Sequence, residues 1–189
     1  ALISAMATTR SVCEQLHLPI QSGSDRLLKI MRRNYDPAGI IEKTNRLCSA
    51  IPLVEVSTDI IVGFPSETDE DFERTLDLVK RLRPSWSYTF KYSPREGTES
   101  AGMADDVPDM LKEERLQRLN ALCDGLTEEA LAARVGTVVE VLDEGDGFGR
   151  TRDGFKVSWT GTGPAGRLVK VRITGTSKRI LKGETDERA

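Results

Sequence analysis

The apolar pattern of this chain changes once, near Gly136, and that change limits the folds open to it. Before it, apolar runs alternate with amphipathic stretches, the order expected of parallel strands covered by helices. After it, short runs of Val, Ile and Thr are separated by Gly, Asp and Pro, as in a small all-β domain. The sequence therefore predicts an α/β domain over 1–135 and a β domain over 136–189.

Strands are expected at 14–20, 54–62 and 86–92, and helices at 24–33, 37–51, 69–82 and 108–134. Asp36 before Pro37 is typical of a helix start, and Thr68 to Asp71 resembles a capping box. Gly125 and Thr127 are expected to interrupt the last helix. Three strands are few for a parallel sheet, because each edge leaves backbone groups unpaired. This favours part of a larger sheet or barrel.

The β domain carries the turn signals Glu144–Gly147, Asp153–Gly154 and Gly161–Gly166. Four or five short strands between such turns favour a small closed barrel, since closure removes sheet edges. Around Val171, apolar residues alternate with Lys170 and Arg172. We therefore expect one face of that strand in the core and the other to be basic.

The net charge of −3 hides an asymmetry. Segment 147–183 holds nine basic residues and one acidic residue, hence +8, so the rest of the chain carries −11. A basic module next to an acidic body indicates an anionic partner, most often a nucleic acid. A solvated strand face is the simpler alternative.

Polar turns follow all three expected parallel strands, at 18–24, 63–68 and 92–98. Because such strands present their carboxyl ends at one edge, these turns indicate a small polar ligand there. Turns also hold these residue types for backbone reasons. His17, the one histidine, is expected to be packed and hydrogen-bonded.

Several classes of protein are disfavoured. Cys13, Cys48 and Cys123 lie 35 and 75 residues apart, which is no metal-ligand spacing, and each is expected to be a small buried side chain in a reducing compartment. No phosphate-binding glycine motif occurs. No apolar run is long enough for a membrane span and no signal peptide is evident, so a cytoplasmic protein is expected.

Three long motifs carry a family resemblance: HLPIQSGSDRLLKIMRRNY (17–35), TDIIVGFPSETDEDFERTLDLV (58–79) and YSPREGTESA (92–101). In this order they resemble the radical-SAM tRNA methylthiotransferases, in particular the branch that modifies isopentenyl-adenosine beside the anticodon. GRTRDGFKV (149–157) is similar to the TRAM domain of that family. The resemblance implies a partial radical-SAM (βα) barrel with parallel strands, followed by a small, OB-like, all-β TRAM barrel.

The resemblance also implies S-adenosylmethionine and two [4Fe–4S] clusters as cofactors, although the cluster-binding cysteines of the family are absent here. The chain is therefore interpreted as a C-terminal fragment that is inactive alone. By the same resemblance, eight residues at the strand ends are expected to contact the cofactor. They are Gln21, Ser22, Gly63, Phe64, Pro65, Glu67, Tyr92 and Arg95.

The expected partner is tRNA, at its anticodon stem-loop, held mainly through phosphates. The basic residues predicted for this are Arg150, Arg152, Lys156, Arg172 and Lys178. Phe148, Phe155 and Trp159 are candidates for base stacking or for the barrel core. Sheet edges left open in a fragment could pair two chains as a dimer.

Two other functions remain open. The chain could be a stand-alone RNA-binding protein with a non-catalytic α/β part. It could also belong to a methylthiotransferase that acts on a ribosomal protein, in which case the basic barrel would bind protein.

Overall fold

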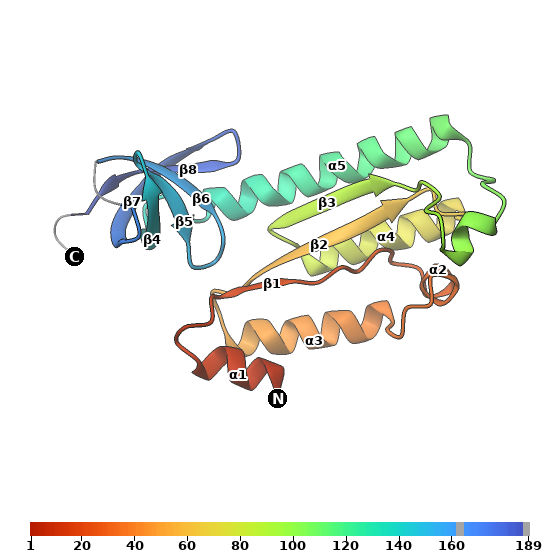
Figure 1. Cartoon of the computed structure of the whole chain (residues 1–189), viewed down its shortest axis with the longest axis horizontal. Helices are drawn as coiled ribbons and strands as arrows, with labels where there is room; N and C mark the ends of the chain where they lie inside the picture. The colour runs from red at the N-terminus through yellow and green to blue at the C-terminus, as the bar shows by residue number, and fades with distance from the viewer. Residues whose placement is uncertain (162–164, 187–189) are drawn as a thin grey trace. The chain divides into compact units, whose positions relative to one another are not determined.

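The computed structural model describes residues 1–161 and 165–186. In chain order the elements are α1 (Leu2–Thr8), β1 (Gln15–His17), α2 (Asp25–Ile30), α3 (Pro37–Ala50), β2 (Glu55–Val62), α4 (Asp69–Leu82), β3 (Trp86–Lys91), η1 (Glu99–Gly102), α5 (Asp109–Ala132), β4 (Val138–Gly145), β5 (Phe148–Thr151), β6 (Lys156–Thr160), β7 (Leu168–Ser177) and β8 (Ile180–Thr185) (Figure 1).

These elements form two compact units. The sheet unit comprises 17–49 and 56–126, and the barrel unit comprises 1–16, 50–55 and the described residues from 127 onward. The chain passes from one unit to the other within α5, so Gly136 lies inside the barrel unit. That one domain ends at residue 135 and the next begins at residue 136 stays a prediction.

The sheet unit is built on three strands in the order β1-β2-β3. β2 and β3 are parallel, with Ser57 opposite Trp86, and all three arrows point toward the end where α2 lies (Figure 1). β1 is shorter than the predicted 14–20, because Pro19 has no N–H to donate. Pairing resumes at Gln21, which forms a parallel bridge with Ile60. The predicted parallel α/β arrangement is confirmed.

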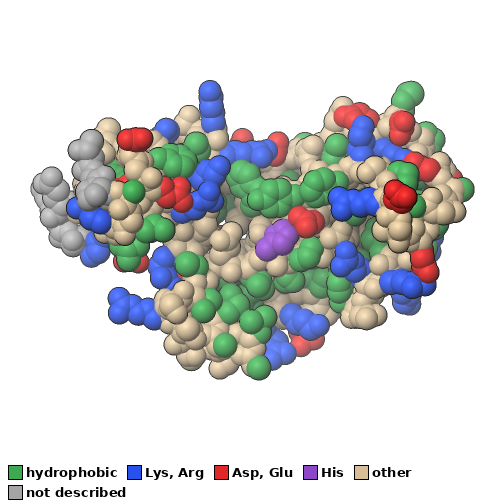
Figure 2. Space-filling model, viewed as in Figure 1, with side chains coloured by type: hydrophobic (Ala, Val, Ile, Leu, Met, Phe, Trp, Pro, Cys, Tyr) green, Lys and Arg blue, Asp and Glu red, His purple; other side chains and the backbone are tan. Residues whose placement is uncertain are grey.

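The helices of this unit share one core with the sheet. Ile40 of α3, Phe72 of α4 and Leu119 of α5 pack with Ile60 and Val62 of β2. The other face of the sheet is open: Tyr88 and Phe90 are each 51% exposed. Figure 2 shows this face, where apolar side chains gather beside the single histidine.

Two helix starts follow the sequence prediction. Thr68 accepts a hydrogen bond from the Asp71 amide and Asp71 accepts one from the Thr68 amide, which completes the capping box. Asp36 accepts from the Gly39 amide at 2.7 Å. The expected interruption of α5 is wrong: the helix runs unbroken to Ala132. Leu126 and Thr127 are both buried, so packing outweighs the low helix propensity there.

The barrel unit contains the predicted small closed barrel. Its strands follow the order β4-β5-β6-β8-β7, and only β6 and β8 are parallel among its described pairs. Val171 and Ile173 point into a core that also holds Leu131 of α5, which confirms the predicted alternation in β7. The predicted turn at 161–166 falls partly on residues 162–164, outside the described residues.

Candidate functional site

A cavity of about 690 Å³ lies where the parallel strands of the sheet unit end. Gln21, Asp59, Ile61 and Phe90 line it from the strands. The rest of the lining comes from Phe64 in the turn after β2, from the end of α2 and the residues that follow it (30–33), and from the end of β3 and its following loop (within 91–100). The site therefore lies at the sheet edge where the polar turns predicted a ligand.

Aromatic rings form part of the cavity wall. Phe64 and Tyr92 meet edge to face, with ring centroids 5.1 Å apart. The Tyr92 hydroxyl donates to the Ser100 carbonyl at 2.7 Å, which fixes that ring against its own loop. Rings held this way suit a flat, partly apolar ligand group.

The turn after β2 is held by a buried ion pair. Glu67 accepts from the Gly63 amide at 2.7 Å and from Arg115 of α5 at 2.9 Å. The side chains of Glu67 and Arg115 are 0% and 2% exposed. Burial raises the pKa of Glu67, against the opposing influence of the Gly63 amide and Arg115. This carboxylate therefore shapes the turn and does not face the cavity.

Gly63 has a structural reason to be glycine. Its φ is +70°, and a Cβ there would lie 2.3 Å from Cγ of Lys112. Lys112 is buried and its ammonium group donates to Asp105 at 2.6 Å. The space beside Gly63 is thus filled by α5. Sequence analysis missed Lys112 and Arg115, because charged residues on a long helix usually face water.

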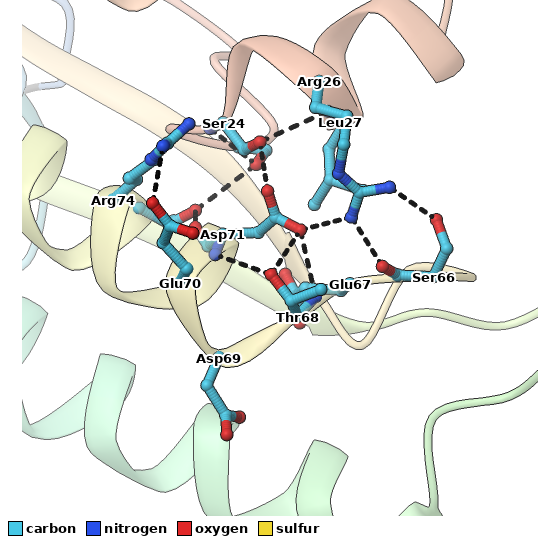
Figure 3. A network of polar contacts seen from close by, with 12 residues as sticks. Ser24, Arg26, Leu27, Ser66, Glu67, Thr68, Asp69, Glu70, Asp71 and Arg74 are labelled. Carbon is cyan, nitrogen blue, oxygen red and sulfur yellow. Dashed lines mark hydrogen bonds and ion pairs between the residues drawn. The ribbon is translucent and has the colours of Figure 1, made fainter.

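A second network joins the start of α2 to the start of α4 (Figure 3). Ser24 donates to Asp71 at 2.5 Å, and Arg26 forms an ion pair with the same carboxylate. Burial acts to raise the pKa of Asp71, but hydrogen bonds from Arg26, Ser24 and Thr68 outweigh it and hold that pKa well below its usual range. The network fixes two of the loops near the strand ends.

The structure brings only some of the eight predicted cofactor residues to the cavity. Gln21, Phe64, Tyr92 and Arg95 line it. Ser22 is fully buried and shares a hydrogen bond with Thr75. Gly63, Pro65 and Glu67 are buried in the turn after β2. None of these four is among the residues that line the cavity.

His17 is hydrogen-bonded as expected, but it is not buried. Its Nδ1 lies 2.9 Å from Ser57 Oγ and its Nε2 lies 3.3 Å from Asp59. The side chain is 43% exposed, because it stands on the open face of the sheet. The cysteine prediction is wrong for Cys13 and Cys48, which are exposed, and right for Cys123.

Three of the five arginines and lysines predicted to bind RNA already have acidic partners in the barrel unit. Arg150 pairs with Glu144, and Arg172 pairs with Asp186. Arg152 pairs with Glu14 at 2.8 Å, which lowers the pKa of that carboxyl, and donates to the carbonyls of Arg10 and Val12. Lys156 and Lys178 have no side-chain partner among the residues the structure describes.

Phe155 and Trp159 lie in the barrel core, so the core alternative is the right one for them. The Arg134 guanidinium lies over the Phe155 ring at 4.0 Å. Arg134 also pairs with Glu55 and with Asp153, the latter at 2.6 Å. These contacts join the turn between β5 and β6 to Arg134, just after α5, and to Glu55 at the start of β2.

Two negative findings concern the described part of the chain. Within 1–161 and 165–186, no three His, Cys, Asp or Glu side chains come together to hold a metal ion. No helix in these ranges combines the length and apolar character needed to cross a membrane.

Comparison with known proteins gives a similarity to a broad class first. Residues 2–79 match the family profile described as Radical SAM superfamily. Coproporphyrinogen III oxidase from Escherichia coli, described as a radical SAM enzyme, has a related fold: 85% of this chain aligns with 41% of that chain at a TM-score of 0.52 and 19% identity. This likeness concerns the fold alone.

The more specific similarity is to proteins named tRNA-2-methylthio-N(6)-dimethylallyladenosine synthase. The chain is 45% identical to that of Anoxybacillus flavithermus over 98% of its own length and 37% of the relative's. It is 42% identical to that of Bacillus subtilis, over 97% and 38% respectively. The resemblance to the radical-SAM tRNA methylthiotransferases is therefore confirmed, although the chain spans well under half of each relative.

Proposed function

We propose that this chain is part of an enzyme that adds a methylthio group to C2 of isopentenyl-adenosine next to the anticodon of tRNA. The observation that carries the proposal is the identity of 42–46% to synthases named for that product, over at least 97% of the chain. The sheet unit would then supply strands of a radical-SAM barrel. The β4–β8 barrel would be its TRAM domain, and the enzyme would work in the cytoplasm.

The residues present do not fit a [4Fe–4S] cluster. Such a cluster is bound by cysteine thiolates that lie close together, whereas Cys13 and Cys48 are exposed and Cys123 is buried in the core of the sheet unit. We therefore assign no cluster ligand and no step of the radical chemistry to this chain. Alone, it is expected to be inactive.

The cavity does fit the nucleoside part of S-adenosylmethionine. Phe64 and Tyr92 offer rings for a purine, while Gln21 and Asp59 offer polar atoms for ribose hydroxyls. When bound beside a cluster, this cofactor supplies the reaction's radical chemistry. The residues of this chain would bind and orient it, with the buried Glu67–Arg115 pair keeping the turn after β2 in place.

RNA binding is assigned to the outward face of the barrel. Lys156 and Lys178 are exposed and are free to meet phosphates. Lys156→Ala is expected to weaken binding to an anticodon stem-loop and to flatten its salt dependence. Arg152→Ala should change RNA affinity less, because Arg152 is held by Glu14. Comparing these two variants also tests whether the barrel binds RNA at all.

The decisive experiment uses the protein purified without oxygen from its native source. Its mass, its iron content and its ability to methylthiolate tRNA carrying isopentenyl-adenosine would be measured. We expect a protein much larger than 20.9 kDa with iron for two clusters and activity on tRNA. An iron-free protein of about that mass would contradict the proposal and favour a stand-alone RNA-binding protein. Activity on a ribosomal protein instead would favour the other branch of the family.

A further inference from the structure

The mouth of the cavity carries more positive than negative charge. Four cationic side chains line the cavity, namely Arg32, Arg33, Lys91 and Arg95, against the carboxylates of Asp59 and Glu99. Two of these cations are already neutralised: Arg32 pairs with Glu99, and Lys91 pairs with Glu113 at 2.9 Å. Arg33 and Arg95 form no ion pair or side-chain hydrogen bond with any residue in the described ranges.

The backbone on each side of these two arginines is fixed, although their guanidinium groups are free. The Arg33 amide donates to the Leu28 carbonyl at 2.8 Å, where α2 ends. The Arg95 carbonyl accepts from both the amide and the hydroxyl of Thr98. Both side chains are exposed and both line the cavity, so they stand at its mouth and not at its floor.

We propose that Arg33 and Arg95 form an anion subsite that takes a phosphate of the RNA backbone beside the nucleotide that enters the cavity. This rests on the proposed function and names how its substrate is held. Aromatic rings and polar groups lie inside the cavity, and free guanidinium groups lie at its edge. In the proposed function the interior holds the nucleoside part of S-adenosylmethionine, so the RNA meets the cavity at this edge, with its target base next to the cofactor and its phosphate at the two arginines. Guanidinium binds phosphate through two parallel hydrogen bonds.

One other anion has similar chemistry, the carboxylate of the amino-acid part of S-adenosylmethionine. Arg95 was expected from the sequence to contact that cofactor. The two sources differ in what removing an arginine affects: RNA affinity in one case, and cofactor affinity in the other.

The test measures binding of a short RNA stem-loop with one loop adenosine to this chain over a range of salt concentrations. The variants are Arg33→Ala, Arg95→Ala and the double variant. Arg81→Ala is the matched control, because Arg81 is exposed on α4, has Asp77 as its ion-pair partner within the described ranges, and does not line the cavity. Lys156→Ala reports independently on binding by the barrel.

We expect each cavity variant to weaken binding about tenfold. Each should also lower the slope of log affinity against log salt by about 0.7, the value for one phosphate contact on a single strand. Arg81→Ala should change neither. Replacing one loop phosphate of the RNA by an uncharged methylphosphonate should weaken RNA binding by the parent chain. It should not weaken binding by the double variant, because both changes remove the same contact.

Two outcomes would overturn the subsite. In one, the double variant keeps the parent's affinity and salt slope while Lys156→Ala loses affinity, which leaves the proposed function standing. In the other, the variants keep RNA affinity but lose binding of S-adenosylhomocysteine relative to 5′-methylthioadenosine, which lacks the carboxylate. Both outcomes concern the subsite alone, because the proposed function is tested separately by the activity of the native protein on tRNA.

Discussion

At the scale of single residues, the least expected feature is a fully buried arginine. Arg115 donates to the Glu67 carboxylate and also to Asp69 at 2.6 Å. Removing a charged group from water is unfavourable unless its partner stays in place. Such a pair therefore specifies one position for the turn after β2 more than it adds stability.

Replacing one member of this pair should be costly. Arg115→Met is expected to lower the free energy of unfolding by about 3–5 kcal/mol, because it leaves the Glu67 carboxylate buried without its cation. Arg118→Met is the control: Arg118 lies one turn further along α5 and pairs with Glu73 at the surface, so less than about 1 kcal/mol is expected. Urea unfolding would measure both. Equal effects of the two substitutions would contradict this account.

The low pKa of Asp71 predicts a dependence of stability on acid. A carboxylate whose pKa is lower folded than unfolded stabilises the protein above the unfolded pKa, about 3.9, and loses that contribution as pH falls. Asp71→Asn should therefore lower stability at pH 7 by about 1–2 kcal/mol. The variant should also lose less stability than the parent protein as the pH is lowered.

The control for this prediction is Asp77→Asn, since Asp77 is exposed and forms an exposed ion pair with Arg81 one turn along the same helix. Chemical denaturation at a series of pH values provides the measurement. An Asp71→Asn curve parallel to that of the parent would show that this carboxylate is not responsible.

At the scale of elements, the helices and strands follow local sequence signals, such as capping residues and turn residues. Thr68 and Asp71 begin α4 as the capping pattern indicates, and the barrel follows from its turns. Local signals do not predict the structure where contacts with residues distant in the sequence determine it. Thr127 is kept helical by packing, and the partners of Lys112 and Arg115 become visible only when α5 meets the turn after β2.

The sequence predicted where the candidate site lies but only some of the residues that line it. The carboxyl ends of parallel strands fall at one edge by geometry, so the cavity was predictable. Which side chains face it depends on the turn itself. Gln21 has a positive φ of 62° and lines the cavity, while its neighbour Ser22 points to Thr75. No pattern in the sequence separates these two.

The burial of Phe155 changes what its replacement should do. Phe155→Ala is expected to destabilise the barrel by about 3–5 kcal/mol, because it removes a core ring and the surface under Arg134. Leu168→Ala, at a residue that is exposed on β7, should have an effect within about 0.5 kcal/mol. Thermal unfolding with RNA binding in parallel would decide. Lost RNA affinity at unchanged stability would instead assign Phe155 to stacking.

At the scale of the whole molecule, the sheet of the sheet unit has two edge strands and an open apolar face. β1 and β3 are the edges, and Phe90 stands half exposed on the open face. Exposed edges and apolar patches of this kind favour association. Pairing of two chains through this sheet stays a prediction.

Light scattering over a range of protein concentrations would test it. We expect a mass that rises toward a dimer, and we expect Phe90→Glu to shift it back toward a monomer, because a charge on an edge strand discourages pairing. Leu53→Glu, which changes an exposed leucine outside the sheet, should leave the mass unchanged. A monomer at every concentration would contradict the prediction.

The ionic contacts of Arg134 and Arg152 affect how the barrel can be studied in isolation. Their acidic partners Glu55 and Glu14 lie far upstream in the chain. A barrel excised at residue 136 would keep Arg152 but lose Glu14, and so would present a guanidinium that the intact chain does not offer. The barrel surface of such an excised domain would bind polyanions more tightly than the same surface does in the intact chain. An affinity measured on the excised domain would therefore overstate what the barrel itself contributes.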